Sequence, residues 1–527
     1  MSSVFGNLRA LFRPYGGINY GLFGLAITFF LVVAALPVPR SLVNLVSETH
    51  PLGYRLQPDT HTITESVNGI LKTEHAPSEI GYKAKIMIAV LFTAAFLWGT
   101  EAIPLGATDL LVGSALYLFA VLPLDDIAKA YMKDAVFFIA GVLAIAVGVS
   151  VTGLDRRIGM LLLGRVRSLA GFCFLFIPFL ALAASFFSEH ALAAILVPVL
   201  VRMYVLICER YKIETDRYLA VVLILGTCFA LNQGGPGSPA AGGRNAIMVG
   251  YLKEFGAPIS FLQWVLIAVP YVLVLSLTVG TVMYVALARK IKAPKVDFRE
   301  SLRSETALNG RMSRPEIVMA MILFSVVALW ITASHRFGLG GPAIFGVVLM
   351  LVFRIIRWRH IQNKVRFDVV GLYAAACAMG VGLKVTGASL WLARTIIHAL
   401  PESMQYGEAL LVAISAFTGT LTNFMSDGAT VAAVGPIALS MGQIGGVHLW
   451  KVGLACAFAS SFANATIVGT PNNAIAYVGA VDPRTGKKLL RLRDFVIYGV
   501  PITLLAMALL WLWAIWGYWR WISWSAL

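Results

Sequence analysis

Charge is scarce in this sequence. Asp, Glu, Lys and Arg make up 13% of its 527 residues, about half their share in an ordinary soluble domain. Hydrophobic residues make up 59%, in blocks long enough to cross a bilayer, which takes about 20 residues as a helix. The composition therefore disfavours a soluble protein and predicts an all-α protein in the lipid bilayer.

Several catalytic and nucleotide-binding motifs are also missing. The sequence has no GxxxxGK[ST] loop, which argues against ATP coupling, and no HExxH or GxSxG motif. An intramembrane enzyme that uses His190 and Glu189 as acid and base is therefore a remote alternative. The five cysteines form no CxxC pair, and we expect no cofactor apart from a coupling ion. The net charge of +16 comes largely from short loops, so it does not predict a nucleic-acid partner.

The apolar blocks predict about 11 transmembrane helices plus two re-entrant hairpins, at 169–207 and 408–441. Each hairpin segment is too long for one crossing. Placing the basic loops in the cytoplasm puts the N-terminus inside, the C-terminus outside and the polar stretch 40–83 on the exported side of a cell inner membrane. The basic loops are at 9–13, 156–167, 289–292, 354–364 and 487–493.

The same order of signals occurs in each half of the chain. A span ends in Val-Thr-Gly, a hairpin tip begins with serine, a proline follows ten residues later, and an Asn-Ala-Ile run comes last. The corresponding residues are 151–153 and 385–387, Ser188 and Ser426, Pro198 and Pro436, and 245–247 and 473–475.

This order predicts two inverted repeats: residues 1–290, a cytoplasmic linker at 291–314, and residues 315–527. Runs rich in Gly, Pro and Asn interrupt the predicted spans 217–255 and 449–481. Unwound backbone at membrane depth is tolerated where it lines a site or is buried in protein. The alternative is that these residues only kink packed helices.

Three motifs resemble those of the divalent anion:sodium symporter family. The run at 98–105 is similar to its W-x-T-E-A-x-P-L signature, the Ser-x-x-Ala tips stand where the family has Ser-Asn-Thr, and 469–473 resembles its Gly-Thr-Pro-Pro-Asn loop. The resemblance implies a homodimer in which a mobile domain carries the substrate as an elevator. It also implies dicarboxylates, citrate or sulfate as substrates, usually with sodium.

The resemblance places the substrate site at the two tips and the two breaks, where this sequence departs from the family. Glu189 and His190 replace Asn and Thr at the first tip, Asp427 and Gly428 replace them at the second, and Arg244 stands in the first break. The expected substrate-binding residues are Ser188, Glu189, His190, Arg244, Asn245, Ser426, Asp427, Gly428, Thr470, Pro471 and Asn473.

These charges leave several mechanisms open. Arg244 either neutralises Glu189 or Asp427, or binds the anion through its guanidinium fork, or belongs to a purely structural ion-pair cluster. His190 or Glu189 could carry a proton, because imidazole ordinarily titrates near neutral pH. Alternatively, sodium binds at Ser188, Glu189, Ser426 and Asp427, since hard cations prefer oxygen ligands.

The predicted function is secondary active transport of a small organic or inorganic anion, of the di- or tricarboxylate or sulfate class, coupled to sodium or protons. One alternative is an obligate anion exchanger. The other is a cation- or proton-coupled antiporter with a non-dicarboxylate substrate, which the two acidic tips favour because carboxylates repel a dianion.

Overall fold

The computed structural model describes residues 17–49, 54–56, 63–67, 70–75, 77–293, 311–467 and 469–524. Helices form almost all of the first half, and a small antiparallel sheet of order β1-β2-β3 interrupts them. Its elements are α2 (Tyr20–Ala35), α3 (Arg40–Thr49), β1 (Tyr54–Leu56), β2 (Ile63–Val67), β3 (Ile70–His75), α4 (Pro77–Thr100), α5 (Leu105–Leu118), α6 (Leu124–Tyr131), α7 (Asp134–Thr152), α8 (Leu154–Leu163), α9 (Leu169–Gly171), η1 (Phe172–Phe176), α10 (Ile177–Ala184), α11 (Glu189–Arg210), α12 (Arg217–Ala220), η2 (Val221–Leu225), α13 (Gly226–Gly234), η3 (Gly235–Gly237), α14 (Gly243–Glu254), α15 (Phe261–Leu287) and η4 (Ala288–Lys290).

Among its described residues, the second half contains helices joined by loops and one isolated β-bridge between Val481 and Lys488. Its elements are α18 (Arg314–Phe337), α19 (Gly340–Val352), α20 (Trp358–Lys364), α21 (Phe367–Val385), α22 (Ala388–Ala399), η5 (Glu402–Met404), α23 (Gly407–Leu421), α24 (Asp427–Ile444), α25 (Leu449–Ala459), α26 (Pro471–Gly479), α27 (Leu492–Leu509), η6 (Leu510–Ile515) and η7 (Tyr518–Arg520).

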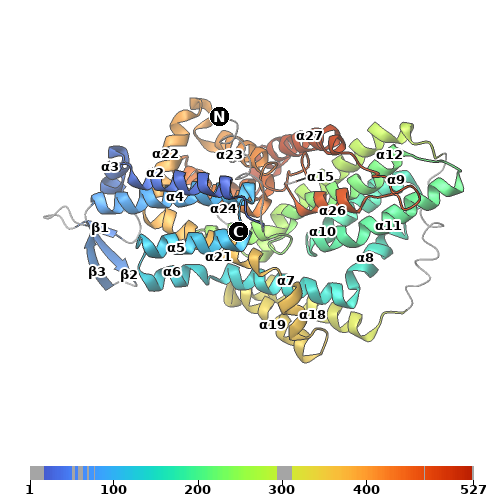
Figure 1. Cartoon of the computed structure of the whole chain (residues 1–527), viewed down its shortest axis with the longest axis horizontal. Helices are drawn as coiled ribbons and strands as arrows, with labels where there is room; N and C mark the ends of the chain where they lie inside the picture. The colour runs from blue at the N-terminus through green and yellow to red at the C-terminus, as the bar shows by residue number, and fades with distance from the viewer. Residues whose placement is uncertain are drawn as a thin grey trace, which may run out of the picture.

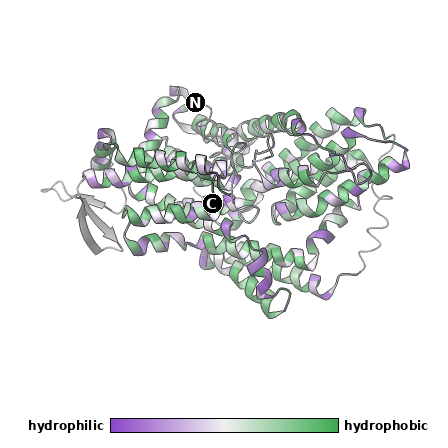
Figure 2. Ribbon diagram, in the orientation of Figure 1, coloured by the Kyte–Doolittle hydropathy of each residue, from purple (hydrophilic) through white to green (hydrophobic). Residues whose placement is uncertain are grey.

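The helices form an elongated bundle. Figure 1 shows α3 and the sheet at one end and α11 and α12 toward the other, with α7, α24 and α26 between them. Apolar residues dominate the helices along their lengths, and many hydrophilic residues lie at helix ends and in connections (Figure 2). Eight helices of the described residues are long and apolar enough to span a membrane, or nine if the bent pair α2 and α3 is one span.

Some predicted spans are shorter than the sequence suggests. Helices α5 and α19 have 14 and 13 residues, about 20 Å of helix. Each ends just before a residue with positive φ, Ala120 at 44° and Arg354 at 56°. Such a backbone conformation cannot continue a right-handed helix, so these helices stop before the apolar run does.

The two predicted hairpins appear as pairs of helices joined by a short turn. In the first pair, residues 185–188 join the arm formed by α9, η1 and α10 to α11; in the second, residues 422–426 join α23 to α24. The broken spans are also present. Residues 238–242 separate η3 from α14, and a longer stretch after α25 precedes α26. The second arm of the first hairpin, α11, has 22 residues and is by itself long enough to span.

The polar stretch 40–83 contains α3 and the sheet, and α4 begins at Pro77. Helix α3 is amphipathic and buries Leu42, Leu45 and Val46, so its polar residues mark an exposed face and not an absence of structure. Most of the 291–314 linker and the basic residues at 9–13 lie outside the described residues.

The W-x-T-E-A-x-P-L run makes the sharp turn between α4 and α5. Glu101 adopts φ 48° just after α4, and Pro104 precedes α5. Trp98 Nε1 donates to Asp109 Oδ1 at 3.2 Å, and both residues are buried. This contact ties the two helices together, so the described structure gives the motif a role in packing.

Candidate functional site

Each hairpin tip is the N-terminus of a buried helix, and a serine caps it. Ser188 Oγ accepts from the backbone N–H of Ala191 at 3.3 Å, and Ser426 Oγ accepts from that of Ala429 at 3.4 Å. Serine satisfies helix-end N–H groups that would otherwise have no partner. The two matched serines are thus held at equivalent positions, with an acidic residue first in each helix.

Arg244 joins the two tips. Its Nη1 donates to Glu189 Oε1 at 3.0 Å and also to Asp427 Oδ2. The side chains of Arg244 and Glu189 are 2% and 3% exposed, and that of Asp427 is 17% exposed. Buried charges at such depth must be paired, and here one guanidinium faces two carboxylates.

The pairing is incomplete. Glu189 Oε2 and Arg244 Nε are buried and have no hydrogen-bond partner among the described residues. With all three groups ionised, the cluster carries one net negative charge. One additional positive charge or proton would therefore make the cluster neutral.

Glycines make the space that the guanidinium occupies. A Cβ atom on Gly235 would lie 1.6 Å from Arg244 Nη2, and one on Gly242 would lie 3.0 Å from Nη1. Tyr373 of α21 closes the same region, because a Cβ on Gly243 would lie 1.6 Å from its hydroxyl oxygen. The Gly-Gly-Arg run of the first break is therefore needed for the guanidinium to reach both tips.

The two breaks are held by asparagines in the same way. Asn245 Nδ2 donates to the carbonyl oxygens of Gly235 and Ser238, at 2.8 and 2.7 Å. Asn473 Nδ2 donates to those of Ala463 and Thr466, at 2.8 and 2.6 Å. In both cases the acceptors lie 10 and 7 residues before the asparagine.

A hydroxyl in each break also ties it to its hairpin tip. Ser238 Oγ donates to the carbonyl of Ser185 at 2.5 Å, and Thr466 Oγ1 donates to that of Asn423 at 2.6 Å. Ser185 and Asn423 each stand three residues before the capping serine of their tip. The correspondence between the halves therefore extends to individual hydrogen bonds.

A chain of side-chain amides connects the first tip with the second break. His190 Nδ1 lies 2.8 Å from Asn472 Oδ1, and Asn472 Nδ2 donates to Asn232 Oδ1 at 2.9 Å. Asn232 Nδ2 then donates to Asn464 Oδ1 and Asn473 Oδ1, each at 3.1 Å. Amide groups in such a chain are satisfied only when donor and acceptor alternate along it.

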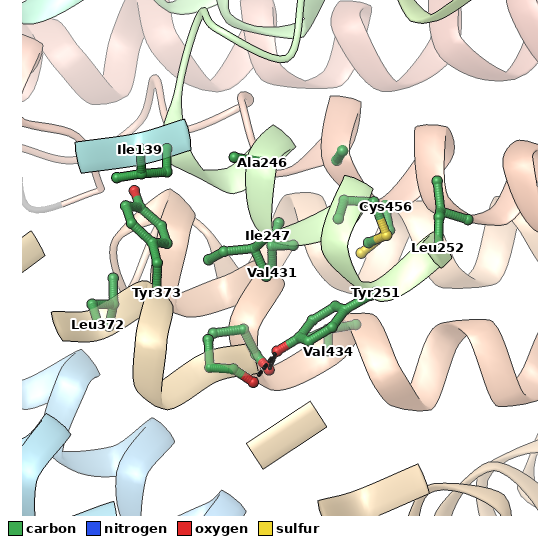
Figure 3. Close-up of a cluster of buried hydrophobic side chains, with 14 of the residues drawn as sticks. Ile139, Ala246, Ile247, Tyr251, Leu252, Leu372, Tyr373, Val431, Val434 and Cys456 are labelled. Atoms are coloured by element: carbon green, nitrogen blue, oxygen red, sulfur yellow. Dashed lines mark hydrogen bonds between the residues drawn. The ribbon is translucent and has the colours of Figure 1, made fainter. Parts of the chain in front are cut away.

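Helix α14, which carries Arg244, is fixed from several sides. Figure 3 shows Ile247, Tyr251 and Leu252 of α14 beside Val431 and Val434 of α24, and Cys456 of α25. The Tyr251 hydroxyl lies 3.0 Å from the carbonyl oxygens of Ala376 in α21 and Ala432 in α24 (Figure 3). The guanidinium therefore extends from a rigid, buried support.

Comparison with known proteins identifies the family. Residues 67–525 match the model of the sodium:sulfate symporter transmembrane region. The chain belongs to this family. It is 26% identical over 461 residues to the sodium-dependent high-affinity dicarboxylate transporter 3 of Caenorhabditis elegans, covering 78% of this chain and 79% of that protein. It is also 26% identical over 426 residues to the sodium-dependent dicarboxylate transporter SdcS of Staphylococcus saprophyticus, covering 76% of this chain and 81% of SdcS.

Solved structures show the same fold at low sequence identity. The YdaH transporter of Alcanivorax borkumensis superimposes with a TM-score of 0.53 at 14% identity, covering 94% of this chain and 98% of YdaH. MtrF of Neisseria gonorrhoeae gives 0.52 at 12% identity, covering 96% of this chain and 97% of MtrF. The symporter family and the named relatives are transporters and not enzymes.

In this symporter-family chain, the structure brings most of the sequence-predicted residues into one connected region. Glu189, Arg244 and Asp427 meet directly, and Gly428 donates its backbone N–H to Asp427 Oδ1 at 2.7 Å. Thr470 is buried at the start of α26, whereas Pro471 is exposed. Neither forms a described side-chain hydrogen bond to the charged cluster.

Other polar residues of this region were not among the predicted site residues. They are Ser185, Asn232, Gln233, Tyr373, Asn423, Asn464 and Asn472. The asparagines could have been found, since Asn232 and Asn464 stand in the Gly- and Pro-rich breaks. Tyr373 carries no such signal, because it lies in the middle of an apolar helix and reaches the region only through packing.

Proposed function

We propose that this chain is a secondary active transporter that carries a small anion of the di- or tricarboxylate or sulfate class across the inner membrane. The transport is driven by a sodium or proton gradient. The observation that carries the proposal is the meeting of three helix N-termini at one guanidinium: Glu189 begins α11, Asp427 begins α24 and Arg244 is the second residue of α14.

Helix N-termini present unpaired N–H groups and positive dipole ends, which favour anions. Their convergence between two interrupted spans is the arrangement that transporters with inverted repeats use for a midplane site. The matched hydrogen bonds of Asn245 and Asn473 support assigning residues 1–290 and 315–527 to two such repeats. The sodium-dependent dicarboxylate relatives support both the substrate class and the cation.

In the proposed cycle, the tips and breaks move together as one transport domain against a fixed scaffold, in an elevator motion within a homodimer. Arg244 and the helix N-termini would contact the anion. The other predicted residues that would shape the tips and breaks around it are Ser188, Asn245, Ser426, Gly428, Thr470, Pro471 and Asn473. The proposed topology has the N-terminus in the cytoplasm and the C-terminus outside.

Sodium would find its predicted ligands largely engaged. Ser188 and Ser426 hydroxyl oxygens already accept from their helices, and Arg244 occupies one oxygen each of Glu189 and Asp427. Glu189 Oε2 is the buried oxygen of this set without a partner among the described residues.

The test is uptake of labelled succinate, citrate and sulfate into liposomes that contain the purified full chain. We expect net uptake of at least one of these anions under an inward sodium or proton gradient, and little without a gradient. Exchange of internal for external anion without any gradient-driven net uptake would instead establish the obligate exchanger.

The excess carboxylate of the cluster favours the second candidate, a cation- or proton-coupled antiporter, whose signature is uptake driven by an outward cation gradient.

A further inference from the structure

Tyr373 reaches the charged cluster from a helix that belongs to neither a tip nor a break. It extends from α21, which packs against both α14 and α24 (Figure 3). A Cβ atom on Gly243 would lie 1.6 Å from its hydroxyl oxygen, and one on Gly428 would lie 3.4 Å from that oxygen. These glycines are the first residue of α14 and the second of α24, and they adjoin Arg244 and Asp427 in the chain. The hydroxyl therefore lies at the N-terminal ends of both helices.

The Tyr373 hydroxyl forms no hydrogen bond to the described residues, which is unusual for a buried tyrosine. The Tyr251 and Tyr271 hydroxyls, by contrast, lie 3.0 and 2.8 Å from backbone carbonyl oxygens. Asp427 is the carboxylate next to Gly428, but its Oδ1 already accepts from the Gly428 N–H and its Oδ2 from the guanidinium. The O–H of Tyr373 is thus left to donate to another acceptor.

The surroundings of this hydroxyl suit an anion. Tyr373 keeps 7% of its surface exposed and the Asp427 side chain keeps 17%, so this part of the cluster is open to an incoming group. Helix N-termini and a guanidinium favour negatively charged oxygens, and an O–H donor adds a hydrogen bond to them without adding charge. The hydroxyl is therefore placed to hydrogen-bond an anion that is held at the two helix N-termini.

We propose that Tyr373 is a substrate-contacting residue, whose hydroxyl donates a hydrogen bond to an oxygen of the carried anion. This inference rests on the proposed function and adds to its site a residue from outside the tips and breaks. In the proposed elevator motion, the tips and breaks move relative to α21, so the contact forms only in the position that this structure shows. Tyr373 therefore stabilises the anion-loaded carrier in this position.

The test separates the hydroxyl from the ring. Tyr373→Phe removes the hydroxyl and keeps the ring that packs beside Gly243 and Gly428. A hydrogen bond to a charged group contributes strongly to binding, so we expect the KM for the anion to rise about tenfold or more in this variant. The melting temperature of the anion-free protein should stay near that of the wild type, because this hydroxyl bonds to no described residue.

Tyr271→Phe is the matched control. It removes another buried hydroxyl, which donates to the carbonyl oxygen of Ala506 at 2.8 Å. We expect the opposite pattern from this variant, a lower melting temperature with an unchanged KM, because the lost hydrogen bond lies within the protein and leaves a buried carbonyl without its donor.

Two measurements are made on the full-length chain and its variants. Uptake of labelled succinate, citrate and sulfate into liposomes gives the KM and the maximal rate. Thermal melts with and without each anion report binding in the absence of transport, because a ligand that binds only the folded state raises the melting temperature. Tyr373→Phe should lose most of the anion-induced shift, and Tyr271→Phe should keep it.

The outcomes distinguish the inference from the proposed function. If the wild type neither takes up nor is stabilised by any of the three anions, the proposed function fails and the inference fails with it. If the wild type responds to an anion and Tyr373→Phe keeps its KM and its full anion-induced shift, only the inference fails, and the residue has a packing role alone. A lower maximal rate with an unchanged KM would also overturn the inference, because the hydroxyl would then act on the motion and not on the anion.

Discussion

Replacing Arg244 by methionine is the sharpest test of the buried cluster. The substitution keeps much of the side-chain volume and removes the charge that faces Glu189 and Asp427. Breaking a buried ion pair by removing one partner costs about 3–5 kcal/mol, because the remaining charge is left uncompensated. The average entropy of unfolding for 527 residues is about 1.1 kcal/mol/K, so the expected loss is about 3–5 °C in melting temperature.

The same reasoning predicts a rescue. Combining Arg244→Met with Glu189→Met and Asp427→Leu removes all three charges, and replacements of buried ion pairs by hydrophobic residues of similar volume are often as stable as the original. We therefore expect the triple variant to recover most of the lost melting temperature, although it should not transport. Glu189→Gln with Asp427→Asn alone should be destabilised, because it leaves the guanidinium buried without a counter-charge.

Arg366→Met is the matched control. Arg366 pairs with Asp368 at 2.6 Å, but these side chains are 59% and 37% exposed, so the pair is worth at most about 1 kcal/mol. The assay is a thermal melt of each purified variant in one detergent. Equal shifts for Arg244→Met and Arg366→Met, or no recovery in the triple variant, would refute the description of a strongly coupled buried cluster.

Three further predictions concern the surroundings of the cluster. Gly235→Ala should abolish anion uptake and lower the free energy of unfolding by about 1–3 kcal/mol, because the added Cβ would lie 1.6 Å from Arg244 Nη2. Normal uptake by this variant would show that the guanidinium need not occupy this place. Asn473→Ala should lower the melting temperature more than Asn245→Ala. Each substitution leaves two carbonyls without their donor, at about 1–3 kcal/mol per group, but Asn473→Ala also removes the acceptor of Asn232 and Cys228, whereas Asn245 Oδ1 has no partner among the described residues; a larger shift for Asn245→Ala would contradict this reasoning. In the loop after α26, the hydrogen bond from Arg484 holds the pKa of Asp482 below its ordinary value. The ionised Asp482 therefore adds to the free energy of unfolding above its unfolded-state pKa, and this stabilisation is lost as pH falls through the lower folded-state pKa. Melts from pH 6 down to about pH 2 should therefore show a smaller acid-induced loss for Asp482→Asn than for the wild type, and identical curves would refute this role.

Much of the architecture follows from the sequence alone. Apolar runs of membrane length are enough to predict helices, because an isolated backbone in lipid has to satisfy its own hydrogen bonds. The matched Val-Thr-Gly runs also mark helix ends for a local reason, the backbone conformation of their glycines. Gly153 and Gly387 both adopt φ 78°, a left-handed conformation in which glycine is favoured. The serine-led runs likewise predicted the two hairpin tips, and in the structure each serine caps a helix by a local contact.

The tertiary structure decided how the charged residues combine. The sequence left open whether Arg244 pairs with Glu189 or with Asp427, which are 55 and 183 residues away from it. Their meeting depends on the packing of α14 against α24 and α21, and on the space left by Gly235. The contact of His190 with Asn472, which is 282 residues away along the chain, was equally hidden. Periodicity and capping are local properties of a chain, whereas the polarity of a hydrogen-bond network exists only once distant segments are packed together.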